Sequence, residues 1–173
     1  MKKVLTLLFF ITAVLLPACT PKYNTVNGCE IRPKTVCIKS DLSGLDLSAD
    51  DLNGANLDRT DLSGAKLTKT NLKGADLTGA YLTRANAQYA DLSGANLRGA
   101  NLRHAALVRA DLRHADLRDA NLRDANLYDA ALHGANLRHA VLVRADLYNA
   151  RYDKDTIFPK GFDPEAAGMV LVE

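Results

Sequence analysis

The chain of 173 residues has room for one domain and a short tail. Aromatic residues make up only 6% of it and tryptophan is absent, so large flat side chains cannot build the core. With 22 basic and 20 acidic residues, the formal net charge of +2 argues against both a strongly basic nucleic-acid binder and a polyanionic mimic of nucleic acid.

Residues 1–18 have the organisation of an export signal. Two lysines precede an apolar run over residues 4–16, which is too short to cross a bilayer comfortably and is typical of a signal peptide. The run ends in Leu-Pro-Ala-Cys19, which resembles a bacterial lipobox. This resemblance implies that residues 1–18 are removed and that Cys19 is lipidated as the mature N-terminus. Plain secretion to the periplasm and an uncleaved anchor remain the alternatives.

The same resemblance implies a place in the bacterial cell envelope. Thr20, rather than Asp, follows the cysteine, which favours the outer membrane, facing the periplasm. Residues 19–28 then comprise the lipidated cysteine and a polar tether. Residues 29–39 form an N-terminal cap segment. Export would expose Cys29 and Cys37 to an oxidising compartment, so we expect a disulfide between them. Zinc is the weaker alternative, because no histidine lies near this pair and two thiolates do not complete a site.

Residues 40–154 contain 23 copies of a five-residue repeat without insertion. The central residue is Leu in 21 copies, with Ala87 and Tyr152 as the exceptions, and the residue two places earlier is Ala in 18. Successive leucines would lie roughly 140° apart on a helix and on opposite faces of a straight strand. The chain must therefore bend once per repeat to keep Leu and Ala inside. Eight of the eleven glycines stand two places after a centre, where such a bend needs them.

The pattern, as in Ala95-Asn96-Leu97-Arg98-Gly99, resembles that of the pentapeptide-repeat family. The resemblance implies an all-β fold, a right-handed quadrilateral β-helix with four repeats per coil, hence about 5.75 coils for 23 repeats. In that fold Ala87 would leave an underfilled position between the leucines of the neighbouring coils. Residues 155–173 form the C-terminal cap and tail, in which Asp163, Pro164 and Gly168 predict a short capping helix.

The sequence offers no catalytic motif. No glycine-rich phosphate loop and no nucleophile elbow is present, and most carboxylates of the repeats directly precede a centre, where the repeat itself explains them. The four histidines lie in the C-terminal half, and two of them, His114 and His133, are expected one coil apart. Their only predicted neighbours, Arg113 and Gly134, do not supply a third metal ligand. We therefore expect no enzyme activity, no cofactor and no metal site.

Charge is unevenly placed along the repeats. Residues 40–97 carry 5 basic and 8 acidic residues, whereas residues 98–154 carry 10 and 7. Arg98, Arg118 and Arg138 recur every 20 residues, so they are predicted to form a column that serves as an interaction face. The alternative is a solvated surface in which Asp116 and Asp119 neutralise Arg118.

The leading functional hypothesis is a non-enzymatic scaffold or protein-interaction module, held at the envelope by its N-terminal lipid. Its partner would be an unidentified protein or an anionic envelope component, with no nucleic acid expected. The family resemblance supplies an alternative, because some members mimic DNA and bind type II topoisomerases. The export signal and the balanced charge of the repeats, 15 basic and 15 acidic residues, argue against it.

Overall fold

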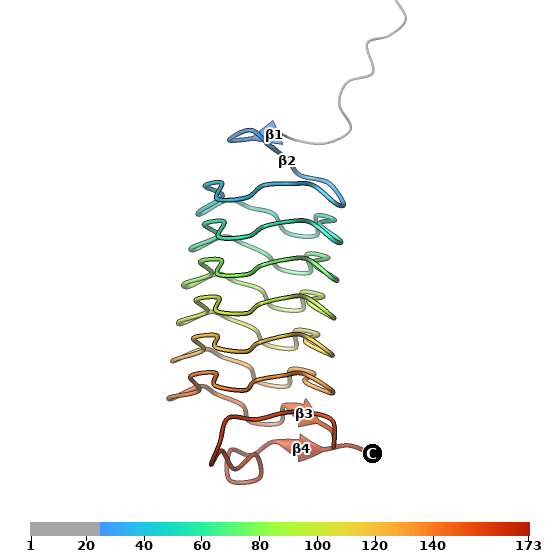
Figure 1. Cartoon of the computed structure of the whole chain (residues 1–173), viewed down its shortest axis with the longest axis vertical. Coiled ribbons are helices and arrows are strands. Elements are labelled where there is room, and N and C mark those ends of the chain that lie inside the picture. The colour runs from blue at the N-terminus through green and yellow to red at the C-terminus, as the bar shows by residue number, and fades with distance from the viewer. Residues whose placement is uncertain (1–24) are drawn as a thin grey trace, which may run out of the picture.

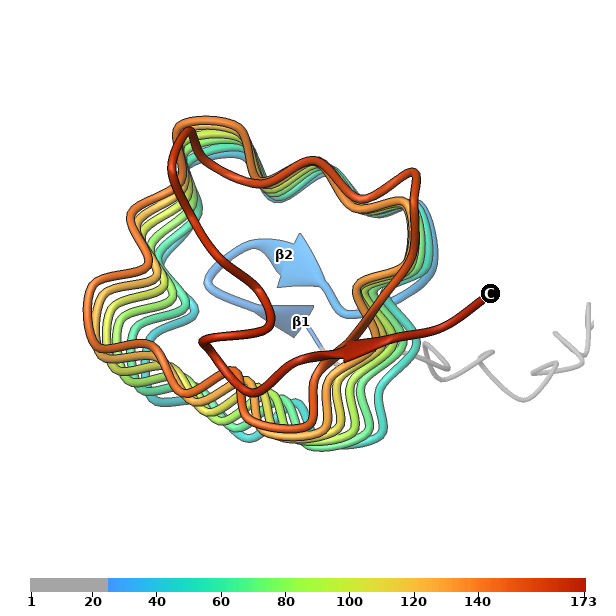
Figure 2. The ribbon, with the colours of Figure 1, turned by 90° about the horizontal axis from the view of Figure 1, so that it is seen from below.

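The computed structural model of the chain describes residues 25–173. The predicted signal peptide, Cys19 and most of the predicted tether lie outside the described residues. From the N-terminal hairpin onwards, the chain winds in coils that stack along the long axis of the molecule (Figure 1). Seen along that axis, the successive coils superimpose (Figure 2).

Four ladders of parallel β-bridges hold the coils together. Each bridge joins a residue to the one 20 positions later, except the last, Asn136–Ile157, and the ladders begin with the pairs Val36–Asn56, Asp41–Asp61, Asp46–Lys66 and Asp51–Asn71. Between these bridges the N–H of each leucine centre from Leu42 to Leu137 donates to the coil that follows, for example from Leu62 to the carbonyl oxygen of Tyr81 at 2.7 Å. The bridged segments are single residues separated by turns, because the chain bends once per repeat. The predicted β-helix is confirmed.

The interior is built from the leucine and alanine columns. All twelve of the largest fully buried side chains are leucines. Where threonine replaces the alanine, it remains fully buried and its hydroxyl finds a backbone acceptor: Thr60 donates to the carbonyl of Cys37 at 2.5 Å and Thr70 to that of Leu47 at 2.7 Å. These hydrogen bonds offset the cost of placing a hydroxyl in an apolar core.

A hairpin closes the N-terminal end. Strand β1 (Thr25–Val26) pairs antiparallel with β2 (Cys29–Glu30) through a two-residue turn, in which Asn27 and Gly28 both have positive φ. In the structure a disulfide joins Cys29 to Cys37, with their Cα atoms 5.3 Å apart. This bond ties the hairpin to the first coil.

The coil begins one repeat before the predicted start at residue 40. Val36 already bridges to Asn56, and Cys37 is buried at 2% exposure in the column that leucines occupy elsewhere. The reason is that Thr35-Val36-Cys37 supplies a buried small residue, an outward residue and an apolar centre. These are the physical requirements of the repeat, although none of the three residues is of the type usual at its position.

The C-terminal end is closed by an added strand and an aromatic cluster. Strand β3 (Arg151–Tyr152) pairs in parallel with β4 (Val170–Leu171). The Tyr152 ring packs edge-on against Phe158 at 5.3 Å between centroids, and Phe158 stacks on Phe162 at 5.2 Å. These three rings cover the last open coil.

The predicted capping helix at Asp163–Gly168 is wrong, because residues 25–173 contain no helix. Asp163 does cap a turn, since its Oδ1 accepts the N–H groups of Glu165 and Ala166 at 3.0 and 3.1 Å. Gly168, at φ 74°, already ends that turn by donating to the carbonyl of Glu165. The N-cap and the C-terminal glycine are too close together for more than one turn to form. Nor does any part of this range form a helix of the length and apolarity that crossing a bilayer requires.

Candidate interaction surface

Where the outward residue before a centre is Asp or Asn, it has a structural task. Its side-chain oxygen accepts the backbone N–H two residues later, as Asp41 does from Ser43 at 3.0 Å and Asn136 from Arg138 at 3.1 Å. This hydrogen bond fixes the bend of the repeat. The many aspartates in this position are therefore used by the turn.

The corner residue, two places after each centre, carries the backbone strain of the coil. It has a φ of about +52 to +67°, whether or not it is glycine, in every repeat except the last, whose corner is Lys154. A non-glycine residue in this region costs about 1–2 kcal/mol. Eight corners between residues 98 and 154 are nevertheless occupied by charged residues or histidine: His104, Arg109, His114, Asp119, Asp124, Asp129, His139 and Arg144.

Ion pairs neutralise the charge of some of these corner residues. Arg109 Nε lies 2.8 Å from Asp129 Oδ2, one coil on, and Arg144 Nε lies 2.5 Å from Asp124 Oδ1, one coil back. The hydrogen bond from Arg144 is the main reason that the pKa of Asp124 is lowered. Arg109 also lies over the Tyr89 ring, 5.9 Å from its centroid.

The predicted column of Arg98, Arg118 and Arg138 is unevenly compensated. Arg118 binds Asp116 through Nε at 2.8 and 3.0 Å to the two carboxylate oxygens, and this contact lowers the pKa of Asp116. Asp119, which the sequence pairs with Arg118, lies instead 3.5 Å from Nε of Arg98. Arg138 forms no ion pair with any residue in the range 25–173. The column therefore presents one uncompensated guanidinium.

The structure brings His114 and His133 together, as expected. The backbone N–H of His114 donates to the carbonyl of His133 at 2.9 Å, and the His114 ring lies against Gly134, where an added Cβ would overlap it. Nδ1 of His133 is buried and has no hydrogen-bond partner among the described residues. Between residues 25 and 173, no three His, Cys, Asp or Glu side chains are grouped so that they could hold a metal ion.

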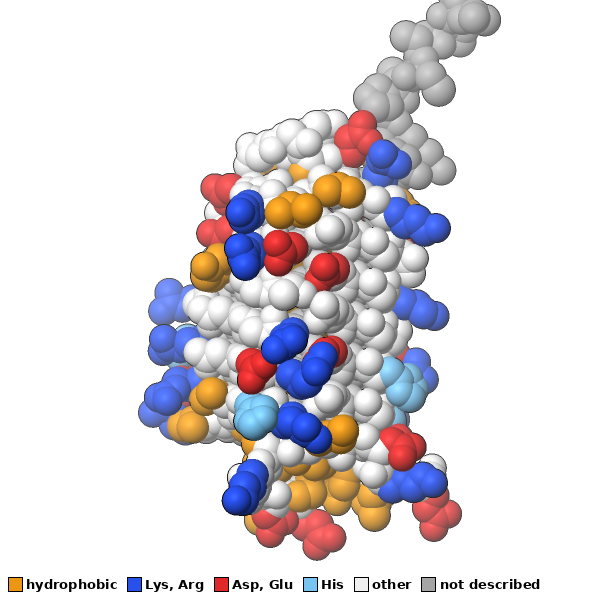
Figure 3. All heavy atoms as spheres, viewed as in Figure 1, with side chains coloured by type: hydrophobic (Ala, Val, Ile, Leu, Met, Phe, Trp, Pro, Cys, Tyr) orange, Lys and Arg blue, Asp and Glu red, His pale blue; other side chains and the backbone are white. Residues whose placement is uncertain are grey.

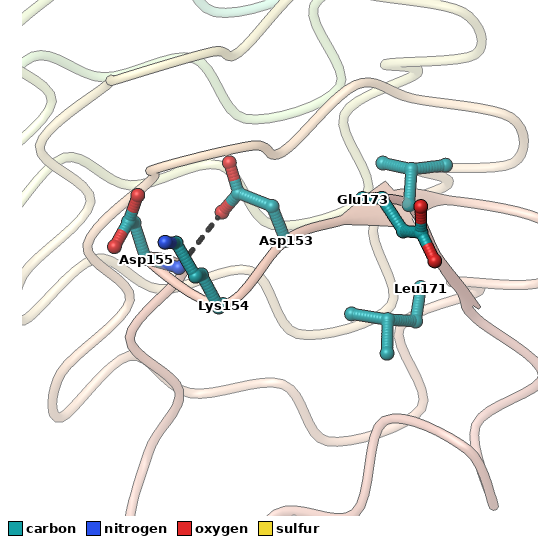
Figure 4. A pocket seen from close by; sticks show the side chains of 6 residues that line it. Asp153, Lys154, Asp155, Leu171 and Glu173 are labelled. Carbon is teal, nitrogen blue, oxygen red and sulfur yellow. Dashed lines mark hydrogen bonds between the residues drawn. The ribbon is translucent and has the colours of Figure 1, made fainter.

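Hollows of about 240–490 Å³ interrupt the described surface, and two of them involve the last coil. The larger, about 490 Å³, lies at the C-terminal end (Figure 4) and is lined by Asp153, Lys154, Asp155, Leu171, Val172 and Glu173. The smaller, about 240 Å³, lies on the flank and is lined by Arg109, Ala110, Asp111, Arg113, Ala131, His133 and Arg151. We call the smaller one the flank pocket.

The flank pocket was not predicted from the sequence. The signal that could have found it is Ala131, a small residue in a position where the repeat usually has Asp or Asn, with Asp111 and Arg151 at 20-residue spacing on either side. Elsewhere, basic and acidic side chains are interspersed over the visible face of the solenoid (Figure 3). No single-sign surface dominates that face.

Comparison with known proteins identifies the repeat. The chain matches the family described as pentapeptide repeats, in eight copies over residues 40–79, 80–119 and 120–151. Among solved structures, it is 42% identical to a pentapeptide repeat protein of Nostoc Pcc 7120, covering 65% of this chain and 84% of that one, with a TM-score of 0.35. It is 33% identical to a pentapeptide repeat protein of the Arabidopsis thaliana thylakoid lumen, covering 65% and 68%, with a TM-score of 0.33.

A more distant similarity is to QnrB1, a plasmid-mediated fluoroquinolone resistance protein. The identity is 20%, the match covers 80% of each chain, and the TM-score is 0.47. The comparison with curated proteins finds no match. The family match spans well over half of the chain and coincides with the coils of the structure, so this chain belongs to the pentapeptide-repeat family.

Proposed function

We propose that this protein is a non-enzymatic interaction module, anchored in the bacterial envelope through a lipid on Cys19. One observation carries the interaction role: charged and histidine side chains occupy strained corners of the C-terminal half, where glycine would fit without steric strain. The interior does not need these side chains, because leucine and alanine alone fill it. Charged side chains placed at strained corners without a role in the core favour a task outside the molecule.

The shape of the module follows from the bridges. Four ladders recur at 20-residue intervals. We infer from them a quadrilateral cross-section, and we keep the right-handed winding and the count of about 5.75 coils as parts of the same proposal. Such a rod would offer four flat flanks to partners.

The lipobox supports the anchoring. From Cys19 to the first described residue, Thr25, an extended chain spans at most about 20 Å. A lipid on Cys19 would therefore hold the hairpin of β1 and β2 close to the membrane and leave the flanks of the rod free in the periplasm. The outer membrane is the proposed site, with a secreted or periplasmic form as the alternative.

The alternative function is that of a DNA mimic that binds a type II topoisomerase. It would need an acidic face and a location in the cytoplasm. The 15 basic and 15 acidic residues of the repeats and the export signal disfavour it. The partner that we propose is accordingly a protein or an anionic envelope component.

Metabolic labelling with a fatty-acid probe tests the anchor. We expect label in the wild-type protein of the envelope fraction and none in the Cys19→Ser variant. Undiminished label in that variant would refute the proposal that Cys19 carries the lipid. Recovery of the wild-type protein in the cytoplasm would favour the topoisomerase alternative.

Partner capture from envelope fractions tests the interaction role of the arginine column. We expect the triple Arg→Gln variant at residues 98, 118 and 138 to keep its fold and to recover less partner, with a salt dependence typical of exposed charges. The double variant Arg103→Gln and Arg123→Gln, in another column of the same spacing, is the matched control. Equal recovery by the wild type and the triple variant would remove the column from the proposal.

A further inference from the structure

The flank pocket forms where the repeat lacks its usual side chain. Ala131 occupies the outward position before a leucine centre, which carries Asp or Asn in 17 of 23 repeats. Its bridge partners on the neighbouring coils are Asp111 and Arg151. Because Ala131 has only a methyl group, a hollow of about 240 Å³ remains between longer neighbours.

The missing side chain also leaves a donor without its acceptor. One coil earlier, Asp111 Oδ1 accepts the backbone N–H of Arg113 at 3.1 Å. The corresponding N–H, that of His133, forms no hydrogen bond with any residue that the structure describes. Nδ1 of the same histidine is buried without a partner as well. A buried polar atom without a partner is costly, and the N–H of His133 needs an acceptor, so both groups of this pocket-lining residue indicate an unfilled polar contact.

The charges around the pocket favour an anion. Burial acts to raise the pKa of Asp111, but the hydrogen bonds from Arg113 outweigh it and lower that pKa, so Asp111 is present as a carboxylate paired with Arg113. Arg109 is likewise paired, with Asp129. Arg151 forms no ion pair within residues 25–173. After these pairs are formed, one guanidinium is left over at the rim.

We propose that the flank pocket binds the carboxylate of an Asp or Glu side chain presented by a protein partner. The incoming carboxylate takes the place of the side chain that Ala131 lacks. One of its oxygens accepts the N–H of His133, and the carboxylate pairs with Arg151. The pocket is smaller than the roughly 300–1,000 Å³ typical of sites for drug-sized ligands, which suits a single side chain. The site rests on these flank residues alone and is independent of the proposed lipid anchor.

A second gap in the repeat provides an internal comparison. Ala106 also replaces the usual Asp or Asn, and the N–H of Val108 likewise has no acceptor in the described part of the chain. Its bridge partners, however, are Asn86 and Asn126, which carry no charge. Both positions thus lack the side-chain oxygen that accepts the backbone N–H. Of the two, only Ala131 is bridged to an arginine without an ion pair among the described residues, Arg151.

Acetate is the probe for the first experiment. With the purified full chain, labelled with 15N and kept in detergent, we expect sodium acetate to shift the amide signal of His133 saturably, and sodium chloride at equal ionic strength not to do so. Ala131→Asp restores the usual residue and should abolish the response without lowering the melting temperature. Ala106→Asp is the matched control and should keep it. A response that survives in Ala131→Asp, or that chloride reproduces, would overturn the site.

Charge removal and a peptide test the ligand class. Arg151→Gln should weaken the acetate response roughly tenfold, whereas Arg138→Gln, which removes another unpaired arginine outside the pocket, should not change it. A short peptide with one Asp between glycines should shift the His133 signal, and its Asn counterpart should not. The proposal fails if inorganic phosphate saturates the signal at lower concentration than acetate, or if the Asp and Asn peptides act alike.

Discussion

The N-terminal half of the coils, residues 40–97, and the C-terminal half, residues 98–154, bury the same leucine and alanine columns but present different outer surfaces. Glycine occupies six of the eleven corners with positive φ in the first half and two of the eleven in the second. Among the described coils, the first half has one ion pair, Lys66–Asp46. The arginine–aspartate pairs all involve the second half: Arg98–Asp119, Arg109–Asp129, Arg113–Asp111, Arg118–Asp116 and Arg144–Asp124.

The difference shows that this fold separates the residues needed for stability from those that vary over its surface. The interior residues and the turn-forming Asp and Asn residues are needed in every coil, so they repeat in both halves. The corners and the outward residues after each centre are free to vary. Their enrichment in arginine and histidine in one half is therefore a property of the surface, and the fold does not require it.

Core truncation should have the largest effect and should not distinguish the halves. Leu92 and Leu132 are both almost fully buried, so Leu92→Ala and Leu132→Ala should each cost about 2–5 kcal/mol in denaturant unfolding. A much smaller loss for one of them would show that the two interiors differ.

Ala87 allows the converse test of the interior, in which side-chain volume is added instead of removed. Ala87 is buried at 1% exposure between Leu67 and Leu107 of the neighbouring coils. We predict an underfilled position, so Ala87→Leu should leave the melting temperature unchanged or raise it. A clear fall would show that the neighbours already fill the space.

Loss of the disulfide should have the next largest effect, at one end only. Closing the short loop between Cys29 and Cys37 is worth about 2.5 kcal/mol in the chain-entropy model. Cys29→Ser with Cys37→Ser should therefore increase amide exchange in the hairpin and the first coil and leave residues 98–154 unchanged. Free-thiol counting on denatured, unreduced protein should find neither cysteine reactive in the wild type, and two reactive thiols would refute the pairing.

Corner strain can be compared directly between the halves. Gly94 (φ 64°) has open space around an added Cβ, whereas at Gly134 (φ 64°) the Cβ would overlap the His114 ring. Gly94→Ala should cost about 1–2 kcal/mol of unfolding free energy from the backbone alone. Gly134→Ala should cost more, and the excess should disappear in a His114→Ala background. An excess that persists there would point to strain elsewhere in the coil.

The interior could be predicted from the sequence because burial depends on residue types at a fixed period. The five-residue spacing of Leu and Ala demands a bend per repeat, but it does not set the number of repeats per coil. The spacing of the bridges, nearly all between residues 20 apart, is visible only in the structure. The first repeat was not predicted because Thr35, Val36 and Cys37 differ from its usual residue types. They still supply the buried small residue, the outward residue and the apolar centre that the repeat requires. The capping helix failed because the signals for its two ends stand too close together.

The surface was less predictable, because contacts between coils depend on the direction in which each side chain points. The sequence offered both Asp116 and Asp119 to Arg118, and only the structure divides them between Arg118 and Arg98. The flank pocket arises from the absence of a side chain at Ala131, and motif searches look for residues that are present. A comparison of each residue with those 20 positions away would have found both features.

The smallest expected effect concerns the acid stability of one surface pair. Arg118 holds the pKa of Asp116 below its ordinary value of 3.8, so the pair stabilises the fold above that pH and loses its contribution as the pH falls through the lowered pKa. Arg118→Gln should lower the melting temperature at neutral pH by about 2 °C or less, because an exposed pair is screened by water and salt. The difference between variant and wild type should shrink to nothing below the lowered pKa.

The first half supplies the control for this measurement. Arg59 stands at a left-handed corner and forms no ion pair with the residues that the structure describes, so any effect of Arg59→Gln should not depend on pH in the same range. If the two variants show the same acid dependence, the Arg118–Asp116 contact contributes nothing measurable in solution. In that case the aspartate of the pair serves only its turn, through the hydrogen bond that its Oδ1 accepts from the backbone N–H of Arg118 at 3.1 Å. The guanidinium would then be as available to a partner as that of Arg138, and the arginine column would present more uncompensated charge than the ion pairs of the structure indicate.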